Sequence, residues 1–304
     1  MPPITARIAP AILALALALP AAAQVATKTF RYAFETAETG FDPAELSDLY
    51  SSTVIANLFD APLGYDYLAR PLKLVPNTLA AMPEITQDGT LYTMRVKPGI
   101  YFAEDPAFGG KRRELVAEDY VYSIKRLFDP RRKSPNLYQF EGWIVGMDEV
   151  LADARRNNRM DYDRVAEGLR ALDRYTWQVR LKQPNYNFLY YLAYCNLTCA
   201  VAREVDEMYG ARVGEHPVGT GPYRLAFWKR SSKMVFERNP GYREEFYDET
   251  PAEGDETAKA IAAKLKGKRL PMVDRIEVSV VEEPQPRWLA FLNAEFDFLE
   301  RVPN

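Results

Sequence analysis

The sequence predicts an α/β fold, because it combines two kinds of hydrophobic pattern along one chain. Some segments alternate apolar with polar or small residues, as Tyr223, Leu225 and Phe227 do, which is typical of strands. Others repeat apolar residues at helical spacing, as in residues 116–130, where they form one stripe. With 304 residues, 47% of them hydrophobic, the chain can build sizeable cores, and its length suits about two domains.

Residues 1–23 are predicted to be a cleaved signal peptide that takes no part in the fold. Arg7 gives the segment a positive start, an apolar run follows over 8–19, and Ala21 and Ala23 provide the small residues required before the cleavage site. The apolar run is too short to anchor the protein stably in a bilayer. Because no cysteine stands directly after this apolar run, where a lipid would be attached, we expect export to the periplasm without a lipid or membrane anchor.

Composition argues against several classes of function. The 39 basic and 42 acidic residues give a net charge of −3, which becomes −4 without Arg7 and does not favour a nucleic-acid surface. His216 is the only histidine, so a Ser-His-Asp triad would have to form around it, and a zinc site built on histidines is excluded. We expect His216 to lie at the surface, and we expect no metal, no cofactor and no catalysis. The 19 tyrosines suit either ligand surfaces or strand edges.

The first elements of the mature chain are a strand, a turn and a helix. Phe30–Phe34 alternates in the manner of a strand, and Asp42 and Pro43 then form a turn. Residues 47–59 have helical spacing, with Ser47 and Asp48 as candidate caps at the start.

The next elements are a hairpin and an acidic-capped helix. Asp88 and Gly89 predict a hairpin turn that leads into a strand over 91–96. The helix over 116–130 opens with Glu118 and Asp119, whose negative charges stabilise the positive N-terminal end of a helix. It stops at the pair Asp129 and Pro130.

The centre of the chain is predicted to hold helices over 146–169 that are broken at Asn157 and Asn158, a strand over 175–181 and an aromatic helix over 186–194. Cys195 and Cys199 follow, and they are the only cysteines. An exported protein with two cysteines invites a disulfide. An extended chain would hold the two too far apart and a turn would bring them within range, so both states stay open.

A glycine loop at 217–222 opens the hairpin that follows. The missing Cβ atoms of Gly219 and Gly221 let the backbone turn tightly or lie against a neighbour, and Pro222 delays the strand until Tyr223. The loop lacks the lysine ending and the glycine spacing of phosphate-binding loops, so a nucleotide site is not expected.

The last part of the chain contains a charged segment and two regular elements. Residues 247–270 are acidic first and basic later, with a helix-prone stretch over 258–265, and we expect a surface insertion. A strand is predicted over 273–280 and a helix over 287–298.

Two segments, taken in order, resemble a known signature. Residues 217–223 read PVGTGPY and residues 238–242 read RNPGY, which is similar to the family 5 extracellular solute-binding proteins of bacterial ABC importers, the oligopeptide and dipeptide receptor class. The hairpin over 74–102 and the helix from Ala117 also resemble that family. The chain departs from it at the 247–270 insertion, and at Ala294, where glycine is usual.

The resemblance implies a fold like that of periplasmic binding proteins, in which two lobes enclose the ligand. This chain would supply the first lobe, with the second lobe missing: a main mixed α/β domain over 24–59 and 184–304, interrupted by a smaller α+β domain over 60–183. The chain would then be a fragment, a truncated product, or a protein unable to bind tightly alone. The 247–270 segment would be a charged insertion within the main lobe.

The resemblance also implies a function and a site. The chain would be the exported substrate-binding component of an ABC transporter, capturing peptides or similar small solutes and working with a membrane permease. Ligand in this class passes near the loop before the first helix, so Ser47, Asp48 and Tyr50 are candidate contacts, although they would equally serve as caps and surface.

Two alternatives remain at this stage. An exported hydrolase would use Glu118 and Asp119 as a carboxylate pair, but neighbouring helical residues point in different directions. The other alternative is a structural or interaction protein derived from a receptor lobe that no longer binds solute.

Overall fold

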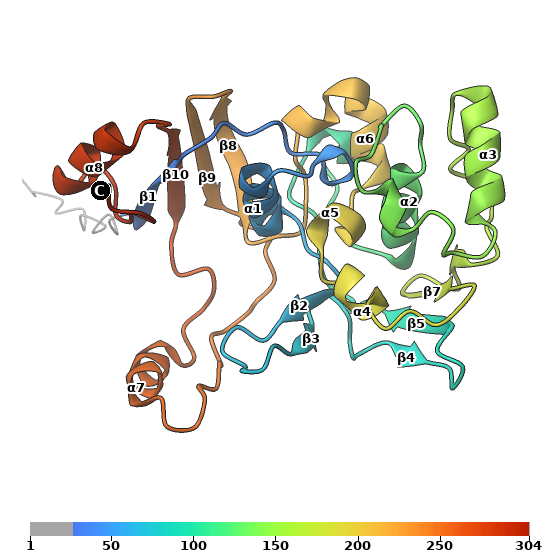
Figure 1. Cartoon of the computed structure of the whole chain (residues 1–304), viewed down its shortest axis with the longest axis horizontal. Coiled ribbons are helices and arrows are strands. Elements are labelled where there is room, and N and C mark those ends of the chain that lie inside the picture. The colour runs from blue at the N-terminus through green and yellow to red at the C-terminus, as the bar shows by residue number, and fades with distance from the viewer. Residues whose placement is uncertain (1–26, 304) are drawn as a thin grey trace, which may run out of the picture.

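The described residues, 27–303 of a computed structural model, form two four-stranded sheets, a two-stranded hairpin and the helices around them (Figure 1). The signal peptide predicted over 1–23 lies outside these residues. The strands are β1 (Thr29–Phe34), β2 (Leu63–Tyr65), β3 (Leu74–Pro76), β4 (Glu84–Ile85), β5 (Leu91–Arg95), β6 (Leu169–Ala171), β7 (Thr176–Arg180), β8 (Tyr223–Lys229), β9 (Lys233–Arg238) and β10 (Arg275–Val280). The helices are α1 (Leu49–Leu58), α2 (Ala117–Leu127), α3 (Met147–Asn157), α4 (Phe188–Tyr191), α5 (Cys195–Thr198), α6 (Arg203–Tyr209), α7 (Glu256–Leu265) and α8 (Pro284–Leu292), with short 3-10 helices η1 (Pro43–Glu45), η2 (Pro106–Phe108), η3 (Leu137–Gln139) and η4 (Gly210–Glu215).

The main sheet joins the two ends of the described chain. Its strand order is β1-β10-β9-β8, with β1 parallel to β10 and the remaining pairs antiparallel. Thr29 is therefore the partner of Arg275 across the first ladder. Helix α1 packs on this sheet through Val54, Ile55 and Leu58, in the same buried cluster as Phe34 and Met234 of the strands.

The second sheet has the order β4-β5-β7-β6 and is antiparallel throughout. Its core includes helix α2, where the ring of Tyr120 stacks on that of Trp177 with centroids 5.4 Å apart, and both side chains are fully buried. The mixed α/β architecture expected from the sequence is confirmed. The division at 60 and 183 stays a prediction, because the core of this sheet also takes in Phe188 and Leu192.

The glycine loop lies directly against the end of helix α1, which is the second of the two roles that its glycines predicted. A Cβ atom added to Gly219 would stand 2.1 Å from the carbonyl oxygen of Leu58, and one added to Gly221 would stand 2.7 Å from that of Asn57. The amide of Gly221 donates to the Leu58 oxygen at 3.0 Å. Only glycine permits this approach, which ties the start of β8 to α1.

Two helix predictions in the centre of the chain were wrong in part. The predicted break at Asn157 and Asn158 is present, since α3 ends there. The segment 158–169 is not a second helix: Asn158 takes a left-handed φ of 46° and the amide of Arg159 turns back to the oxygen of Ala154 at 3.0 Å. This is a common way for a helix to end. The aromatic helix expected over 186–194 shrinks to the single turn of α4, followed by the separate turn of α5.

Two later predictions also need correction. The apolar alternation of Tyr223, Leu225 and Phe227 breaks at a β-bulge between Leu225 and Phe227, which leaves Phe227 with 51% of its surface exposed. The helix expected over 287–298 is α8, which begins and ends earlier than the prediction. Asn293 is its C-cap, and Ala294 follows with a left-handed φ of 58°.

Replacing Ala294 by glycine is expected to raise the free energy of unfolding by about 0.5–1 kcal/mol, because glycine adopts positive φ without steric cost and is the usual residue at this place. The turn is well formed: Ala294 donates to Phe291 at 3.0 Å and Glu295 donates to Ala290 at 2.9 Å. Urea denaturation would measure the gain. Asn293→Gly is the control, because its φ of −81° relieves no strain; an equal gain in both variants would contradict the explanation.

The charged segment 247–270 forms an arm with helix α7 near its tip. The two sides of the arm are joined by bonds from Tyr247 to Lys268 at 2.9 Å and from Leu270 to Glu245 at 2.8 Å. Figure 1 shows α7 standing apart from both sheets. Across the described residues, no helix has the length and apolarity to cross a membrane.

Candidate functional site

The loop that precedes α1 is held by two side-chain amides from distant parts of the chain. Asn136, just before η3, donates from Nδ2 to the carbonyl oxygen of Leu46 at 2.7 Å. Asn196, in α5, donates to the same oxygen at 2.9 Å and also to Ser52 at 3.0 Å. Because both amides are buried, the backbone that follows Leu46 has a fixed starting point. We call residues 46–50 the Leu46 loop.

The three candidate ligand residues have different environments within the Leu46 loop. Ser47 is exposed. Asp48 is the N-cap of α1: it accepts from the amide of Ser51 at 2.8 Å and from the hydroxyl of Thr39 at 2.6 Å. Tyr50 packs on Phe34, with ring centroids 4.8 Å apart. Ser47 and Asp48 precede α1 and Tyr50 lies in its first turn, and the contact of all three with a ligand stays a prediction.

The hydrogen bonds around Asp48 influence its charge. Partial burial alone would raise the pKa of Asp48, but bonds from Thr39 and Ser51 lower it below the ordinary aspartate value. Asp48 therefore stays ionised at neutral pH, and its negative charge stabilises the positive N-terminal end of α1.

Exposed apolar and aromatic side chains occur in the Leu46 loop and close in sequence to the amides that hold it. Leu49 is 74% exposed, Tyr138 is 66% exposed and Tyr194 is 41% exposed. Tyr138 comes two residues after Asn136, and Tyr194 comes two residues before Asn196. Sequence reasoning singled out neither tyrosine.

Cys195 and Cys199 form a disulfide, which answers the question left open by the sequence. Their Cα atoms lie 4.5 Å apart across the single turn of α5. Asn196 lies inside this closed loop, so the disulfide restrains a residue that holds Leu46. Within residues 27–303, no group of three or more histidine, cysteine, aspartate or glutamate side chains is arranged to bind a metal.

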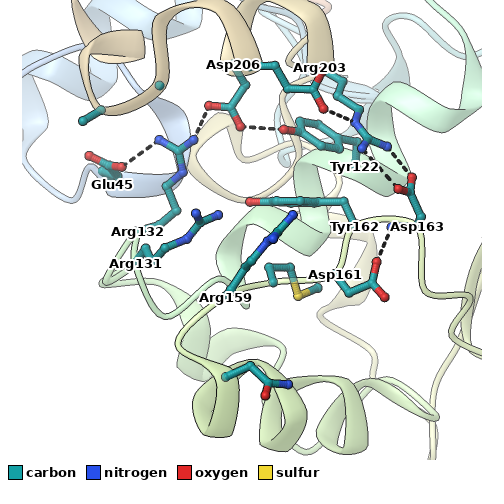
Figure 2. Close-up of a pocket in the computed structure, with 15 residues that line it drawn as sticks. Glu45, Tyr122, Arg131, Arg132, Arg159, Asp161, Tyr162, Asp163, Arg203 and Asp206 are labelled. Carbon is teal, nitrogen blue, oxygen red and sulfur yellow. Dashed lines mark hydrogen bonds and ion pairs between the residues drawn. The ribbon is translucent and has the colours of Figure 1, made fainter.

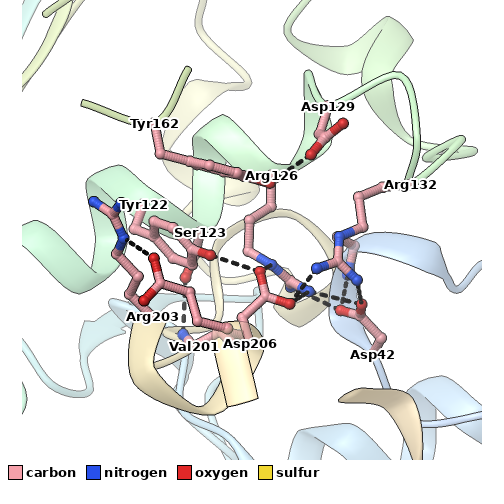
Figure 3. A network of polar contacts seen from close by, with 12 residues as sticks. Asp42, Tyr122, Ser123, Arg126, Asp129, Arg132, Tyr162, Val201, Arg203 and Asp206 are labelled. Atoms are coloured by element: carbon pink, nitrogen blue, oxygen red, sulfur yellow. Dashed lines mark hydrogen bonds and ion pairs between the residues drawn. The ribbon is translucent and has the colours of Figure 1, made fainter. Parts of the chain in front are cut away.

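A buried ion network is centred on Arg126 (Figure 3). Arg126, whose side chain is 1% exposed, donates to both carboxylate oxygens of Asp42 at 2.7 Å and to Asp206 at 3.0 Å. Arg132 pairs with the same two acids, and the hydroxyl of Tyr122 donates to Asp206 at 2.6 Å. The network thus joins η1, α2 and α6.

Ion pairing makes the network sensitive to acid. Burial alone would raise the pKa of Asp206, but the charges of Arg126 and Arg132 lower it below the usual aspartate value. A depressed pKa stabilises the fold above the unfolded value of about 3.9, and this stabilisation is lost as the pH falls through the folded value.

A cavity of about 1120 Å³ opens on the outer side of this network (Figure 2). Its charged lining consists of four arginines and five carboxylates. The lining residues are Glu45, Tyr122, Arg131, Arg132, Asn157, Arg159, Met160, Asp161, Tyr162, Asp163, Arg203, Asp206, Glu207, Gly210 and Ala211. Ser47, Asp48 and Tyr50 are not among them.

The residues that a hydrolase would need are not brought together. Asp119 is buried, and its carboxylate is bound to Arg113 at 2.7 Å and to the amide of Val116 at 2.8 Å, while Glu118 is exposed. His216 stacks on Tyr209 with ring centroids 3.7 Å apart. Asp119 therefore holds the start of α2, and the adjacent carboxylates do not face each other.

Comparison with known sequences agrees with the resemblance. A model of the bacterial extracellular solute-binding proteins, family 5, middle region, matches residues 73–304. Glutathione-binding protein GsiB of Pectobacterium atrosepticum is 26% identical over 204 residues, which is 67% of this chain and 33% of that protein. Di/tripeptide-binding protein 2 of Pseudomonas aeruginosa is 28% identical over 240 residues, which is 76% of this chain and 41% of that protein. The chain spans less than half the length of these relatives.

Solved structures share the fold. OppA of Burkholderia pseudomallei superposes with a TM-score of 0.68 at 16% identity, covering 91% of this chain and 47% of that one. Listeria monocytogenes OppA, solved bound to peptide, gives a TM-score of 0.67 at 18% identity, covering 90% and 46%. The described residues therefore have the mixed α/β fold of periplasmic binding proteins over about half the length of those structures.

Proposed function

Because the chain belongs to the bacterial extracellular solute-binding proteins of family 5, we propose that it is the exported substrate-binding component of an ABC importer. Its ligands would be peptides or similar small solutes, and its partner would be the membrane permease of that importer. Two of the relatives are named as binding proteins for glutathione and for di- and tripeptides, and these names support a peptide ligand.

One observation carries the proposal: two side-chain amides donate hydrogen bonds to the carbonyl oxygen of Leu46. Peptide ligands are commonly bound through main-chain hydrogen bonds, and such bonds need a backbone held in one conformation before the ligand arrives. Asn136 and Asn196 supply that restraint from two segments that lie 90 and 150 residues later in the sequence. The proposed ligand backbone lies along the exposed segment from Ser47 to Leu49.

The neighbouring tyrosines give the surface a way to accept varied side chains. Tyr138 and Tyr194 each offer an apolar ring and a polar hydroxyl, a combination suited to partly wet binding surfaces. A ligand on this loop would be covered from one side by the described residues. We place the opposing lobe of the full-length relatives over the same face, so that closure would enclose the ligand.

Binding to the purified chain would test the proposal. Residues 24–304 would be titrated calorimetrically with a dipeptide, a tripeptide and glutathione, each in a separate experiment. Tyr138→Ala is expected to weaken binding by at least about fivefold, because it removes an exposed aromatic side chain two residues from Asn136. The matched control is Tyr67→Ala in the loop between β2 and β3, where the side chain is 69% exposed and is not close in sequence to Asn136 or Asn196.

The outcomes separate this proposal from the two alternatives. Binding that both variants weaken equally would reject the Leu46 loop as the site. Turnover of a solute, abolished by Asp119→Asn, would instead identify a hydrolase. Absence of solute binding together with retained binding to the permease would favour an interaction protein derived from a receptor lobe.

A further inference from the structure

We infer that the Arg159 side of the cavity in Figure 2, whose lining holds four arginines and five carboxylates, is a separate binding site for a small anion that carries a carboxylate or phosphate group. It lies between residues 122–163, which contribute Tyr122, Arg131 and Arg159, and helix α6, which contributes Arg203 and Asp206. Its volume of about 1120 Å³ exceeds what a single small molecule needs. The site is distinct from the Leu46 loop.

Two guanidinium groups lie on one side of the cavity. Figure 2 shows Arg131 and Arg159 beside Tyr162, whereas Arg132 is turned toward Glu45 and Asp206. Arg131 and Arg132 follow directly after the Asp-Pro stop of α2, and Arg159 follows the end of α3. Guanidinium groups that share one space repel each other, and an anion between them relieves that repulsion.

Two of these arginines are already oriented by protein carboxylates. Arg132, 12% exposed, is fixed by Asp42, Asp206 and Glu45. Arg131 is held by Asp129 through bonds of 3.1 and 2.7 Å, which use only Nε and Nη2. Its side chain is 51% exposed, so its remaining N–H groups are available to a ligand.

Arg159 is the cation with unused binding capacity. Within residues 27–303 its side chain makes no hydrogen bond and no ion pair, so all five of its N–H groups remain free. Its backbone is nevertheless well fixed. The amide of Arg159 bonds to Ala154 at 3.0 Å, the preceding Asn158 adopts a left-handed φ, and the following Met160 is buried.

The opposite wall limits what can bind. Asp163 and Glu207 both pair with Arg203, and Asp161 accepts a bond from the amide of Asp163 at 3.1 Å. These acids are unfavourable to a polyanion that fills the cavity, whereas a single carboxylate or phosphate on the Arg159 side stays clear of them. The ligand class is therefore a small anion of low charge.

Titration of the full mature chain with inorganic phosphate, and separately with succinate, tests the inference. Both titrations would be followed by calorimetry at low, constant ionic strength. Saturable binding of phosphate alone would identify a phosphate site, and saturable binding of succinate alone a carboxylate site. Arg159→Ala is expected to lower the affinity for the anion by about tenfold or more, because it removes a charged guanidinium group with its N–H donors. Arg159→Lys should lose part of that affinity, because it keeps the charge without the fork.

Arg155→Ala is the matched control. Arg155 lies on α3 with an exposed side chain and pairs with Glu141 at 3.0 Å, outside the cavity. It should change anion affinity by less than about twofold, the effect of a distant surface charge. Equal loss in the Arg155 and Arg159 variants would overturn the inference, as would the absence of saturable binding of either anion to the unsubstituted chain. Peptide binding at the Leu46 loop is read separately, so failure of one proposal does not decide the other.

Discussion

Replacing Arg126 by methionine is expected to lower the free energy of unfolding by about 3–5 kcal/mol. Arg126 is the centre of the buried network, with its guanidinium between Asp42 and Asp206 and almost no access to solvent. Methionine fills much of the space but leaves both carboxylates short of a counter-charge. Removing one partner of a buried ion pair costs far more than the pair contributes over an apolar replacement, because the remaining charge stays desolvated.

Urea denaturation followed by circular dichroism would measure the loss for Arg126→Met. Arg155→Met is the control, because that arginine pairs with Glu141 across 3.0 Å at the surface, with 55% and 41% of the two side chains exposed. A surface pair of this kind is expected to contribute at most about 1 kcal/mol. Equal losses in the two variants would show that Arg132 alone neutralises Asp42 and Asp206.

The regular elements were the part of this fold that local sequence could predict. Asp48 caps α1 and Asp119 lies in the first turn of α2, because capping is decided by residues within one turn of the helix start. The strand at Tyr223 begins directly after Pro222, as the missing amide of proline requires. In each case the cause and the effect lie a few residues apart.

The contacts that position the site could not be predicted in this way. Asn136 and Asn196 bond to Leu46 across sequence separations of 90 and 150 residues, and Arg126 bonds to Asp42 across 84. An asparagine that will hold a distant carbonyl does not differ, in its local sequence, from one that faces water. Loop residues such as Ser47 could be proposed from the resemblance, whereas Tyr138 and Tyr194 become visible only once the chain is folded.

One local irregularity was missed for a related reason. The β-bulge before Phe227 depends on how the strand meets its neighbour. The departure at Ala294 was visible as an alanine in place of glycine, and the structure supplies the reason, since φ is 58° there. Sequence reasoning therefore located this position without predicting its conformation.

Replacing Gly219 by alanine is expected to lower the free energy of unfolding by about 3 kcal/mol, the upper part of the range for overpacking. The new Cβ would stand 2.1 Å from the carbonyl oxygen of Leu58 and 2.7 Å from the ring of Phe59. The backbone cannot easily move away, because Gly219 accepts from the amide of Ala103 at 2.8 Å and Gly221 donates to Leu58 at 3.0 Å. The strain therefore falls on the end of α1.

Gly214→Ala is the matched control for Gly219→Ala in urea denaturation. Its nearest heavy atom is the amide nitrogen of Asp42 at 3.5 Å, an ordinary contact, so the free energy of unfolding should change by no more than about 0.5 kcal/mol. Equal changes in the two variants would contradict a role for the close approach. Because the N-terminal end of α1 carries the Leu46 loop, a displaced helix in Gly219→Ala should also weaken peptide binding, whereas Gly214→Ala should leave it unchanged. Loss of stability with unaltered peptide affinity would show that the glycine loop supports the fold without positioning the proposed site.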